Sequence, residues 1–269
     1  MTKIHPTALI DKKARIGEGA EIGPYSVIGP DVTIGAGTRI LSHVVIEGAA
    51  EIGERNVIHH GACIGTPSQD MKTQAVRSSL KVGSDNIIRE YVTINLGSGE
   101  STKTIVGDWN FLMIGAHVGH DCTLGDHVTI ANNCLLGGHV TVEDNAVLGG
   151  LSGVHQFVRI GKFAMIGGKT RIVMDVPPFS LCNGNPAKFY GINTVGLRRG
   201  GFTPEERLAL KKAFKVLSQR GRSQADALAE LRNEFKNNLP IQHLVSFIEK
   251  SKRGVMRGFT DKEVEYVLE

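Results

Sequence analysis

Aliphatic residues recur every six positions through the first two thirds of the chain. Isoleucine stands at positions 4, 10, 16, 22, 28, 34, 40, 46, 52, 58 and 64. The same register returns at Val82, Ile88 and Ile94 and then continues from Val106 to Ile172. A period of six matches neither the 3.6-residue period of a helix nor the two-residue period of a strand. Each six-residue unit is therefore expected to be a short strand followed by a corner.

Small residues mark the corners and the interior of this coil. Glycine often follows the aliphatic residue, as at Gly53, because a missing side chain eases a tight bend. The chain holds 33 glycines but only one tryptophan and four tyrosines, so large aromatic side chains cannot build its core. Small residues such as Ala20 and Ser26 stand two places before the aliphatic position and are expected to point inward. Cys122 and Cys134 hold the same place and are interpreted as core rather than catalytic residues.

This pattern resembles that of hexapeptide-repeat proteins, whose fold is a left-handed parallel β-helix with three flat sides and three six-residue repeats in each coil. The resemblance covers approximately residues 4 to 185 and implies a mainly β fold. Two interruptions preserve the phase, at residues 65–81 and at residues 95–105, which are rich in glycine, serine and threonine. We expect both to be loops extruded from coils, and loops on a rigid scaffold often carry function.

A helical region is expected after the repeats end at Val176-Pro177-Pro178. Thr203, Pro204 and Glu206 form a capping box with proline in the first helical turn. Ser223 and Thr260 are further candidates for N-cap residues. We therefore predict a catalytic β-helix over residues 1–190 and a C-terminal α-helical domain over residues 191–269.

Composition argues against several classes of protein. The net charge of +4 is modest and the basic residues are scattered, so nucleic-acid binding is not expected. No apolar run is long enough to cross a membrane and the start has no apolar signal segment, which predicts a cytoplasmic protein without membrane insertion. The four cysteines include no CxxC pair, so neither a disulfide framework nor a thiolate zinc site is indicated.

Stacking places several histidines on one edge. Positions separated by three repeats lie on adjacent coils, about 4.8 Å apart. His120, Gly138 and Gln156 then form one column, and Asp121 and His139 form its neighbour. His117 lies three residues before His120, across one corner, and His155 lies beside Gln156, either lining the site or orienting its neighbour.

Acyl transfer is the chemistry that would use this cluster. A neutral imidazole can take the proton of an attacking sugar hydroxyl, which makes His120 the candidate general base. The backbone N–H of Gly138 could bind the oxyanion that forms at a thioester carbonyl, and Asp121 could hold the imidazole tautomer. No serine or cysteine nucleophile stands beside a base, so direct transfer without an acyl-enzyme is expected. No metal site is predicted.

Longer motifs resemble one family closely, the LpxA-type UDP-N-acetylglucosamine O-acyltransferases. They are residues 65–72 (GTPSQDMK), 116–122 (AHVGHDC), 137–140 (GGHV), 154–157 (VHQF), 175–178 (DVPP) and 196–199 (GLRR). The resemblance implies a homotrimer that moves a (3R)-3-hydroxyacyl group from acyl carrier protein to the 3-position of UDP-N-acetylglucosamine, the first step of lipid A synthesis. The acyl carrier protein thioester would be the donor, and no cofactor is implied. A sister family of N-acyltransferases carries a uridine-binding domain before the β-helix, whereas the coils here start at Ile4.

The resemblance also implies roles for individual residues. His117, His139 and Gln156 would contact sugar or acyl oxygens, while Asp70 and Lys72 would recognise the glucosamine from the neighbouring subunit. The residues expected to bind the nucleotide are Asn193, Arg198 and Arg199, the arginines through charge-assisted bonds. The residues expected to line the acyl-chain groove between subunits are Phe163, Met165, Gly168 and Arg171.

Two positions depart from the family pattern. Gly200 stands where many members have a further arginine, and Val195 stands where a carboxylate is common. These departures leave open an altered acceptor, including the 3-amino sugar nucleotide that some relatives acylate on nitrogen.

Two other classes of function share features with this sequence. A γ-type carbonic anhydrase resembles the chain in its β-helix and would need three histidines for zinc, such as His117, His120 and His139, but the spacing does not fit. A non-catalytic scaffold is the second alternative, because fold does not imply function. The basic residues of the C-terminal region are either a solvated face or a docking surface for acyl carrier protein; they are Lys211, Lys212, Lys215, Arg220 and Arg222.

Overall fold

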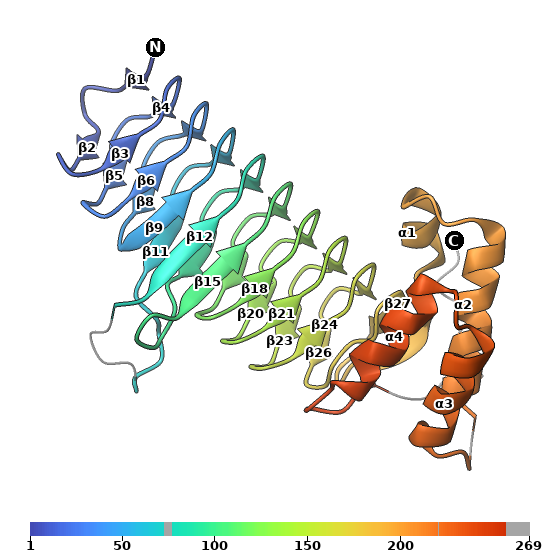
Figure 1. Ribbon diagram of the computed structural model, residues 1–269. Helices are drawn as coiled ribbons and strands as arrows, with labels where there is room; N and C mark the ends of the chain where they lie inside the picture. The colour runs from blue at the N-terminus through green and yellow to red at the C-terminus, as the bar shows by residue number, and fades with distance from the viewer. Residues whose placement is uncertain (73–76, 220, 257–269) are drawn as a thin grey trace.

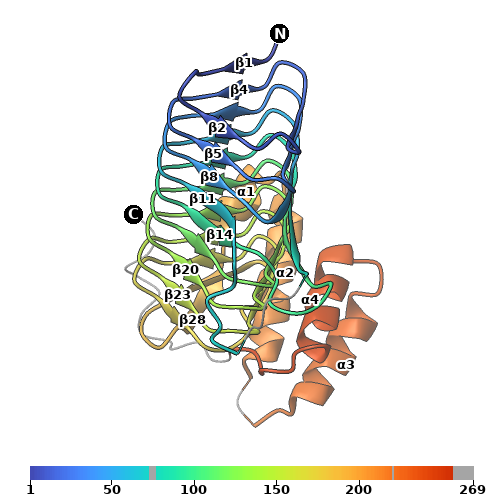
Figure 2. The same ribbon diagram turned by 90° about the vertical axis from the view of Figure 1, so that its left-hand side faces the viewer.

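The chain forms a three-sided parallel β-helix that carries a small group of helices at its C-terminal end (Figures 1 and 2). The computed structural model describes residues 1–72, 77–219 and 221–256. Three sheets, here called A, B and C, make the three faces of the prism, and the coil visits them in this order.

The strands are short and nearly all parallel. Sheet A contains β1 (Lys3–Ile4), β4 (Glu21–Ile22), β7 (Arg39–Ile40), β10 (Val57–Ile58), β13 (Ile87–Ile88), β16 (Phe111–Leu112), β19 (Thr129–Ile130), β22 (Val147–Leu148), β25 (Met165–Ile166), β27 (Ser180–Asn183) and the antiparallel β28 (Lys188–Ile192). Sheet B contains β2 (Leu9–Ile10), β5 (Val27–Ile28), β8 (Val45–Ile46), β11 (Cys63–Thr66), β14 (Thr93–Asn95), β17 (His117–Val118), β20 (Leu135–Leu136), β23 (Gly153–Val154) and β26 (Arg171–Ile172). Sheet C contains β3 (Arg15–Ile16), β6 (Thr33–Ile34), β9 (Ala49–Ile52), β12 (Ser79–Val82), β15 (Lys103–Val106), β18 (Thr123–Leu124), β21 (Thr141–Val142) and β24 (Arg159–Ile160).

The register follows the six-residue repeat. Ile4 pairs with Ile22, three repeats later in the chain. The separation is larger between Ile58 and Ile88, across the first loop, and between Ile94 and Val118, across the second, but it is again a whole number of repeats. Both interruptions are therefore loops that leave the coil without changing its phase.

The repeated aliphatic residues fill the interior of the prism. From Ile22 onward they are buried, and the small residues two places earlier, such as Ala20 and Ser26, are buried with them. Cys122 and Cys134 lie in this core as well. The first coil differs, because no coil covers it from above, and Ile4 is half exposed.

Up to residue 256, where the described part of the chain ends, four helices follow the last coil: α1 (Thr194–Arg199), α2 (Pro204–Leu217), α3 (Gln224–Glu234) and α4 (Leu239–Glu249). The capping box of Thr203 and Glu206 is present at the start of α2, and Ser223 caps α3. The sequence did not predict α1, capped by Asn193, or α4, capped by Asn238. The predicted cap at Thr260 lies outside the described residues.

The helices pack directly on the last coils (Figure 1). Their hydrophobic core includes Phe179 and Phe189 from the strand region. On sheet C, the guanidinium of Arg159 lies 4.0 Å from the centre of the Phe247 ring of α4. This hydrophobic core contains residues on both sides of the predicted domain boundary at residue 190, so the boundary stays a prediction.

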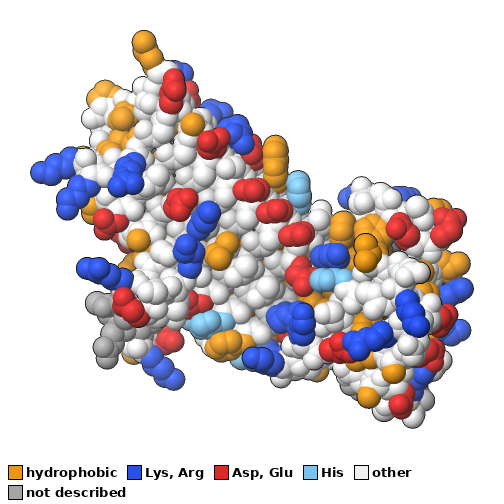
Figure 3. All heavy atoms as spheres, in the orientation of Figure 1, with side chains coloured by type: hydrophobic (Ala, Val, Ile, Leu, Met, Phe, Trp, Pro, Cys, Tyr) orange, Lys and Arg blue, Asp and Glu red, His pale blue; other side chains and the backbone are white. Residues whose placement is uncertain are grey.

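Charged side chains of both signs are mixed on one face of the molecule. On the face drawn in Figure 3, acidic and basic side chains alternate instead of gathering in one patch. Among the helices that the structure describes, none is both long and apolar enough to span a membrane.

Candidate active site

The predicted histidine cluster lies on the edge where sheet B turns into sheet C. His120 follows β17, and Asp121 forms the corner before β18. Asp121, His139 and Phe157 occupy the same corner in three successive coils, each with a positive φ near 60°. This repeated left-handed corner stacks their side chains in one column.

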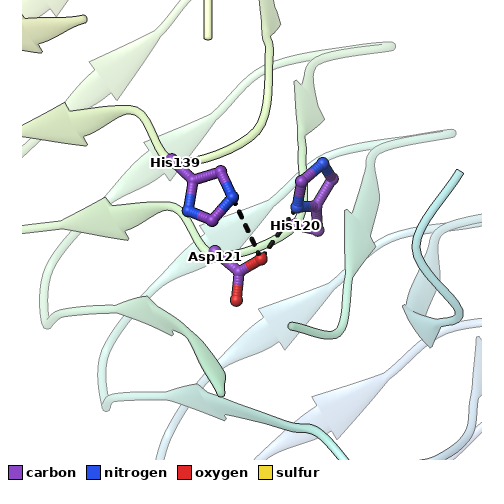
Figure 4. A group of neighbouring side chains, drawn as sticks. All are labelled: His120, Asp121 and His139. Carbon is purple, nitrogen blue, oxygen red and sulfur yellow. Dashed lines mark hydrogen bonds and ion pairs between the residues drawn. The ribbon is translucent and has the colours of Figure 1, made fainter. Parts of the chain in front are cut away.

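His120 and Asp121 form the centre of the cluster. Nδ1 of His120 lies 2.8 Å from Oδ2 of Asp121, and both side chains are less than a tenth exposed. A carboxylate can only accept, so Nδ1 carries the proton and Nε2 is left as the acceptor. Figure 4 shows the His120 and His139 rings on either side of the carboxylate. The arrangement is that of a histidine base with a carboxylate that orients it.

The carboxyl group of Asp121 is kept ionised by its hydrogen bonds. Burial alone raises its pKa, but the bonds donated by Ser98 and His120 outweigh burial, and the pKa lies below its ordinary value. The neighbouring coil adds His139, whose Nε2 lies 3.6 Å from the same oxygen. The ring of His139 stacks on Phe157, with centroids 4.5 Å apart.

Gly138 lies against the imidazole of His120. A Cβ built on this glycine would be 2.3 Å from Nε2 of His120. Throughout the described part of the chain, its N–H finds no acceptor, whereas its carbonyl accepts from the N–H of Phe157. The position therefore offers a free backbone donor beside the candidate base, as an oxyanion site requires.

His117 faces the same space and is held by Thr93. Its Nδ1 lies 2.7 Å from the hydroxyl of Thr93. Burial, followed by repulsion from His120, lowers the pKa of His117. The ring is therefore neutral near pH 7 and can accept or donate a hydrogen bond through Nε2.

A cavity of about 730 Å³ opens in front of the cluster. It brings together predicted residues from five segments: Asp70, Lys72, His117, His120, Gly138, His155, Gln156 and Arg171. Nδ1 of His155 lies 3.1 Å from the carbonyl oxygen of Gln156. Asp70 and Lys72 line the cavity of their own chain. Their recognition of the glucosamine from a neighbouring subunit stays a prediction.

A second cavity of about 330 Å³ lies on sheet A. It is lined by Asn193, Val195 and Arg199 together with apolar residues such as Met165. Arg199 makes no ion pair within residues 1–72, 77–219 and 221–256. The amide of Asn193 already accepts from the N–H of Gly196 and donates to the carbonyl of Phe163. The two cavities share no residue, so one chain does not bring the expected nucleotide residues to His120.

The four residues expected in the acyl groove are not gathered in one chain either. Arg171 lines the first cavity and Met165 the second. Phe163 packs against Phe179 and Phe202 under the helices, and Gly168 is exposed. A single groove would need a second subunit.

The structure relates one departure from the family pattern to a neighbouring residue. A Cβ at Gly200 would lie 2.5 Å from the ring of Phe163, so this backbone leaves no room for the expected arginine. Val195 is half exposed at the second cavity, and Arg198 is exposed at the end of α1.

Sequence reasoning missed the residues that support the cluster, namely Thr93, Asn95, Ser98 and Phe157. Counting forward by three repeats finds a neighbour only in uninterrupted coils, and Thr93, Asn95 and Ser98 lie before or within the second loop. Phe157 could have been found, because it stands one uninterrupted coil after His139.

The three histidines of the carbonic anhydrase alternative do not form one ligand set in this chain. The described residues hold one His, Cys, Asp and Glu group compact enough to bind a metal ion: His120, Asp121 and His139. His117 is not part of it.

Comparison with known proteins identifies the family. The family model described as Udp N-acetylglucosamine O-acyltransferase, domain 2, matches residues 175–256. The bacterial transferase hexapeptide model matches residues 103–138, and the model of the GMPPB C-terminal domain matches residues 4–109.

Two curated relatives carry the name acyl-(acyl-carrier-protein)–UDP-N-acetylglucosamine O-acyltransferase. The protein from Burkholderia lata is 46% identical over 174 residues, which are 63% of this chain and 66% of that protein. The protein from Syntrophobacter fumaroxidans is 45% identical over 258 residues, which are 95% of this chain and 100% of that protein.

Solved structures agree over nearly the whole chain. LpxA from Acinetobacter baumannii has a TM-score of 0.91 at 40% identity, covering 94% of this chain and 99% of that one. The UDP-N-acetylglucosamine acyltransferase of Francisella novicida has a TM-score of 0.92 at 36% identity, covering 99% of both chains. These matches confirm the predicted left-handed β-helix with C-terminal helices. The chain belongs to the LpxA family of UDP-N-acetylglucosamine O-acyltransferases.

Proposed function

We propose that this chain transfers a (3R)-3-hydroxyacyl group from acyl carrier protein to the 3-hydroxyl of UDP-N-acetylglucosamine, the first step of lipid A synthesis. The carrying observation is the pairing of His120 with Asp121 beside the free N–H of Gly138. The curated relatives described above are named as enzymes that transfer an acyl group from acyl carrier protein to an oxygen of UDP-N-acetylglucosamine, which supports the proposal. The acyl donor is a thioester that is already activated, so the proposal needs no cofactor.

In the proposed reaction, Nε2 of His120 takes the proton of the sugar hydroxyl as the oxygen attacks the thioester carbonyl. The N–H of Gly138 donates to the oxyanion, the new C–O bond forms, and the C–S bond breaks. The imidazolium then returns the proton to the departing thiolate. A positioned base contributes about 10²–10⁴-fold, and one oxyanion donor about 10²–10³-fold.

The sugar would be held by the residues that share the cavity with His120. Asp70 and Lys72 from the first loop, His117, and Gln156 supply polar groups along its walls. His139 would contact the sugar or acyl oxygens from the stacked corner beside Asp121. Asn193, Arg198 and Arg199 would bind the nucleotide of a substrate seated in a neighbouring subunit.

A homotrimer is part of this proposal, because two of the three faces carry many apolar side chains outward. Sheet B points Leu9, Val27 and Leu135 outward. Sheet A points Ile87 and Phe111 outward, after three coils that carry the charged Lys3, Glu21 and Arg39. Sheet C instead carries Arg15, Thr33, Glu51, Lys81, Thr123, Thr141 and Arg159 on its outer side. Packing sheet A of one subunit on sheet B of the next buries both apolar faces and closes a ring.

This packing would also complete the site. The second cavity lies on sheet A and the His120 cavity faces sheet B. In the trimer, Arg199 and Met165 of one subunit would therefore face His120 of the next. The acyl groove between subunits would then be lined by residues that one chain keeps apart.

Acyl carrier protein is the expected partner of the helical region. Lys211, Lys212 and Lys215 are exposed on α2, where they could meet an acidic surface. Arg222 is instead paired with Glu230, and Arg220 lies outside the described residues. All four cysteines are free, which suits the reducing cytoplasm proposed as the location.

The reaction is tested with purified protein, UDP-N-acetylglucosamine and a panel of 3-hydroxyacyl carrier proteins, with products identified by mass spectrometry. An acylated UDP-sugar supports the proposal and reports the preferred chain length. The second candidate is transfer to the 3-amino analogue, which Val195 and Gly200 leave open. Acylation of that analogue alone would move the acceptor from oxygen to nitrogen, and no product with either sugar would contradict acyl transfer.

A further inference from the structure

Ser98, in the second loop, holds the carboxylate that orients His120. Its backbone N–H donates to Oδ2 of Asp121 over 3.0 Å, and its hydroxyl donates to the same oxygen over 2.6 Å. Nδ1–H of His120 donates to that oxygen over 2.8 Å. Three donors thus converge on one oxygen, and two of them come from Ser98.

The other oxygen of Asp121 is free to change this arrangement. Oδ1 is buried and receives no hydrogen bond from any residue that the structure describes. The hydroxyl of Thr102 also helps to lower the pKa of this carboxyl group, but the hydrogen bonds that fix its direction all end on Oδ2. The two bonds from Ser98 select Oδ2 as the acceptor that faces His120.

The same segment is tied to the first loop. The buried side chain of Asn95 donates to the hydroxyl of Thr66 over 2.9 Å and to the carbonyl of Pro67 over 3.1 Å. The first loop continues from there to Asp70, which lines the His120 cavity. Residues 95–98 therefore connect the wall of the cavity to the carboxylate behind the base.

We infer that Ser98 is a positioning residue, which acts through Asp121 to keep the Nδ1–H tautomer of His120 and to aim Nε2 at the substrate hydroxyl. The hydroxyl of Ser98 supplies the shortest of the three bonds. Its removal leaves only the backbone N–H of Ser98 and the Nδ1–H of His120 on Oδ2, so the direction of the carboxylate is held less firmly while the cavity keeps its shape. This inference rests on the proposed acyl transfer.

Steady-state kinetics on Ser98→Ala and Ser98→Thr tests it. Loss of the hydroxyl is expected to lower kcat about tenfold, with KM for UDP-N-acetylglucosamine little changed, because Ser98 does not line the cavity. Threonine keeps a hydroxyl donor and is expected to restore most of kcat. Ser98→Ala with wild-type kcat, or Ser98→Thr as slow as Ser98→Ala, would overturn the inference.

Ser26→Ala is the matched control. The hydroxyl of Ser26 also makes two hydrogen bonds, to the carbonyl of Leu41 and from the N–H of Val44, in a coil remote from the site. Its removal is expected to lower the unfolding midpoint and leave kcat unchanged. An equal loss of kcat in Ser26→Ala would assign the effect of Ser98→Ala to stability and overturn the positioning role.

A second readout does not need turnover. In protein labelled with ¹⁵N-histidine, the Nδ1–H of His120 is expected to give a hydrogen-bonded proton resonance, assigned by its loss in His120→Gln. That resonance should broaden or disappear in Ser98→Ala and return in Ser98→Thr. An unchanged resonance contradicts the role of Ser98, whereas an inactive wild-type enzyme with the expected spectra contradicts only the proposed reaction.

Discussion

A Cβ atom on Gly138 would lie 2.3 Å from Nε2 of His120 and from Cε1 of the same ring. Real carbon atoms do not approach this closely, so a side chain at position 138 and the imidazole cannot share the observed space. The Gly138→Ala variant is expected to lose about 10²-fold in kcat, because the base is pushed out of line. In a His120→Ala background the same change should cost much less, since the clash is gone. Equal losses in both backgrounds would contradict this explanation.

His117 makes stability depend on pH. Its folded pKa lies below 6.5, so the unfolded chain binds its proton more readily than the folded protein does. The stability that the neutral ring contributes is present above about pH 6.5 and is lost as the pH falls through the folded pKa. Denaturant unfolding between pH 8 and 5.5 should show a smaller loss of stability in His117→Gln than in the wild type. Identical pH dependence of the two proteins would contradict the shift.

Phe163 and Gly200 are expected to behave as a coupled pair. Arginine at position 200 meets the ring of Phe163, and such overpacking costs about 1–3 kcal/mol. Combining it with Phe163→Ala should cost less than the sum of the single changes. Arginine at the exposed Val195, in the helix that Gly200 caps, is the control and should change stability by less than about 0.5 kcal/mol. Additive free energies of unfolding would show that the ring does not exclude the arginine.

Arg171 is expected to limit the length of the acyl chain. It lies in the outward column of sheet B below Leu135 and Gly153, and a Cβ at Gly153 would meet nothing within 4 Å. An acyl chain that extends from His120 along this open column would end at the Arg171 side chain. Arg171→Gly should raise kcat/KM for longer 3-hydroxyacyl donors about tenfold relative to the preferred one. Lys169→Gly, an exposed change outside the cavity, should leave the preference unaltered.

The sequence predicted the parts of this structure that the repeat controls. Every uninterrupted coil has the same length. Residue numbers alone therefore predicted that His120 lies next to Gly138 and that Asp121 lies next to His139. Ser98 could not be placed in this way, since a loop of unspecified shape separates it from Asp121. The proposed roles of Asn193 and Arg199 raise a different difficulty, because only a second subunit of the proposed trimer would bring them to His120.

The sequence predicted the start of some helices but not of others. Thr203, Pro204 and Glu206 specify the start of α2 through hydrogen bonds between near neighbours. The six residues of α1 carry no comparable pattern, and Asn193 serves as its cap while bonding to Phe163, 30 residues away. Such a contact depends on how the last coil meets the helices.

The most direct test of the account compares rates of UDP-N-acetylglucosamine acylation by the wild type, His120→Ala and His43→Ala. His43 stands at a corner of an early coil beside Tyr25, remote from the cavity. We expect kcat/KM to fall about 10²–10⁴-fold in His120→Ala and to stay at the wild-type value in His43→Ala. A His120→Ala enzyme that acylates the sugar at the wild-type rate would contradict the assignment of His120 as the general base.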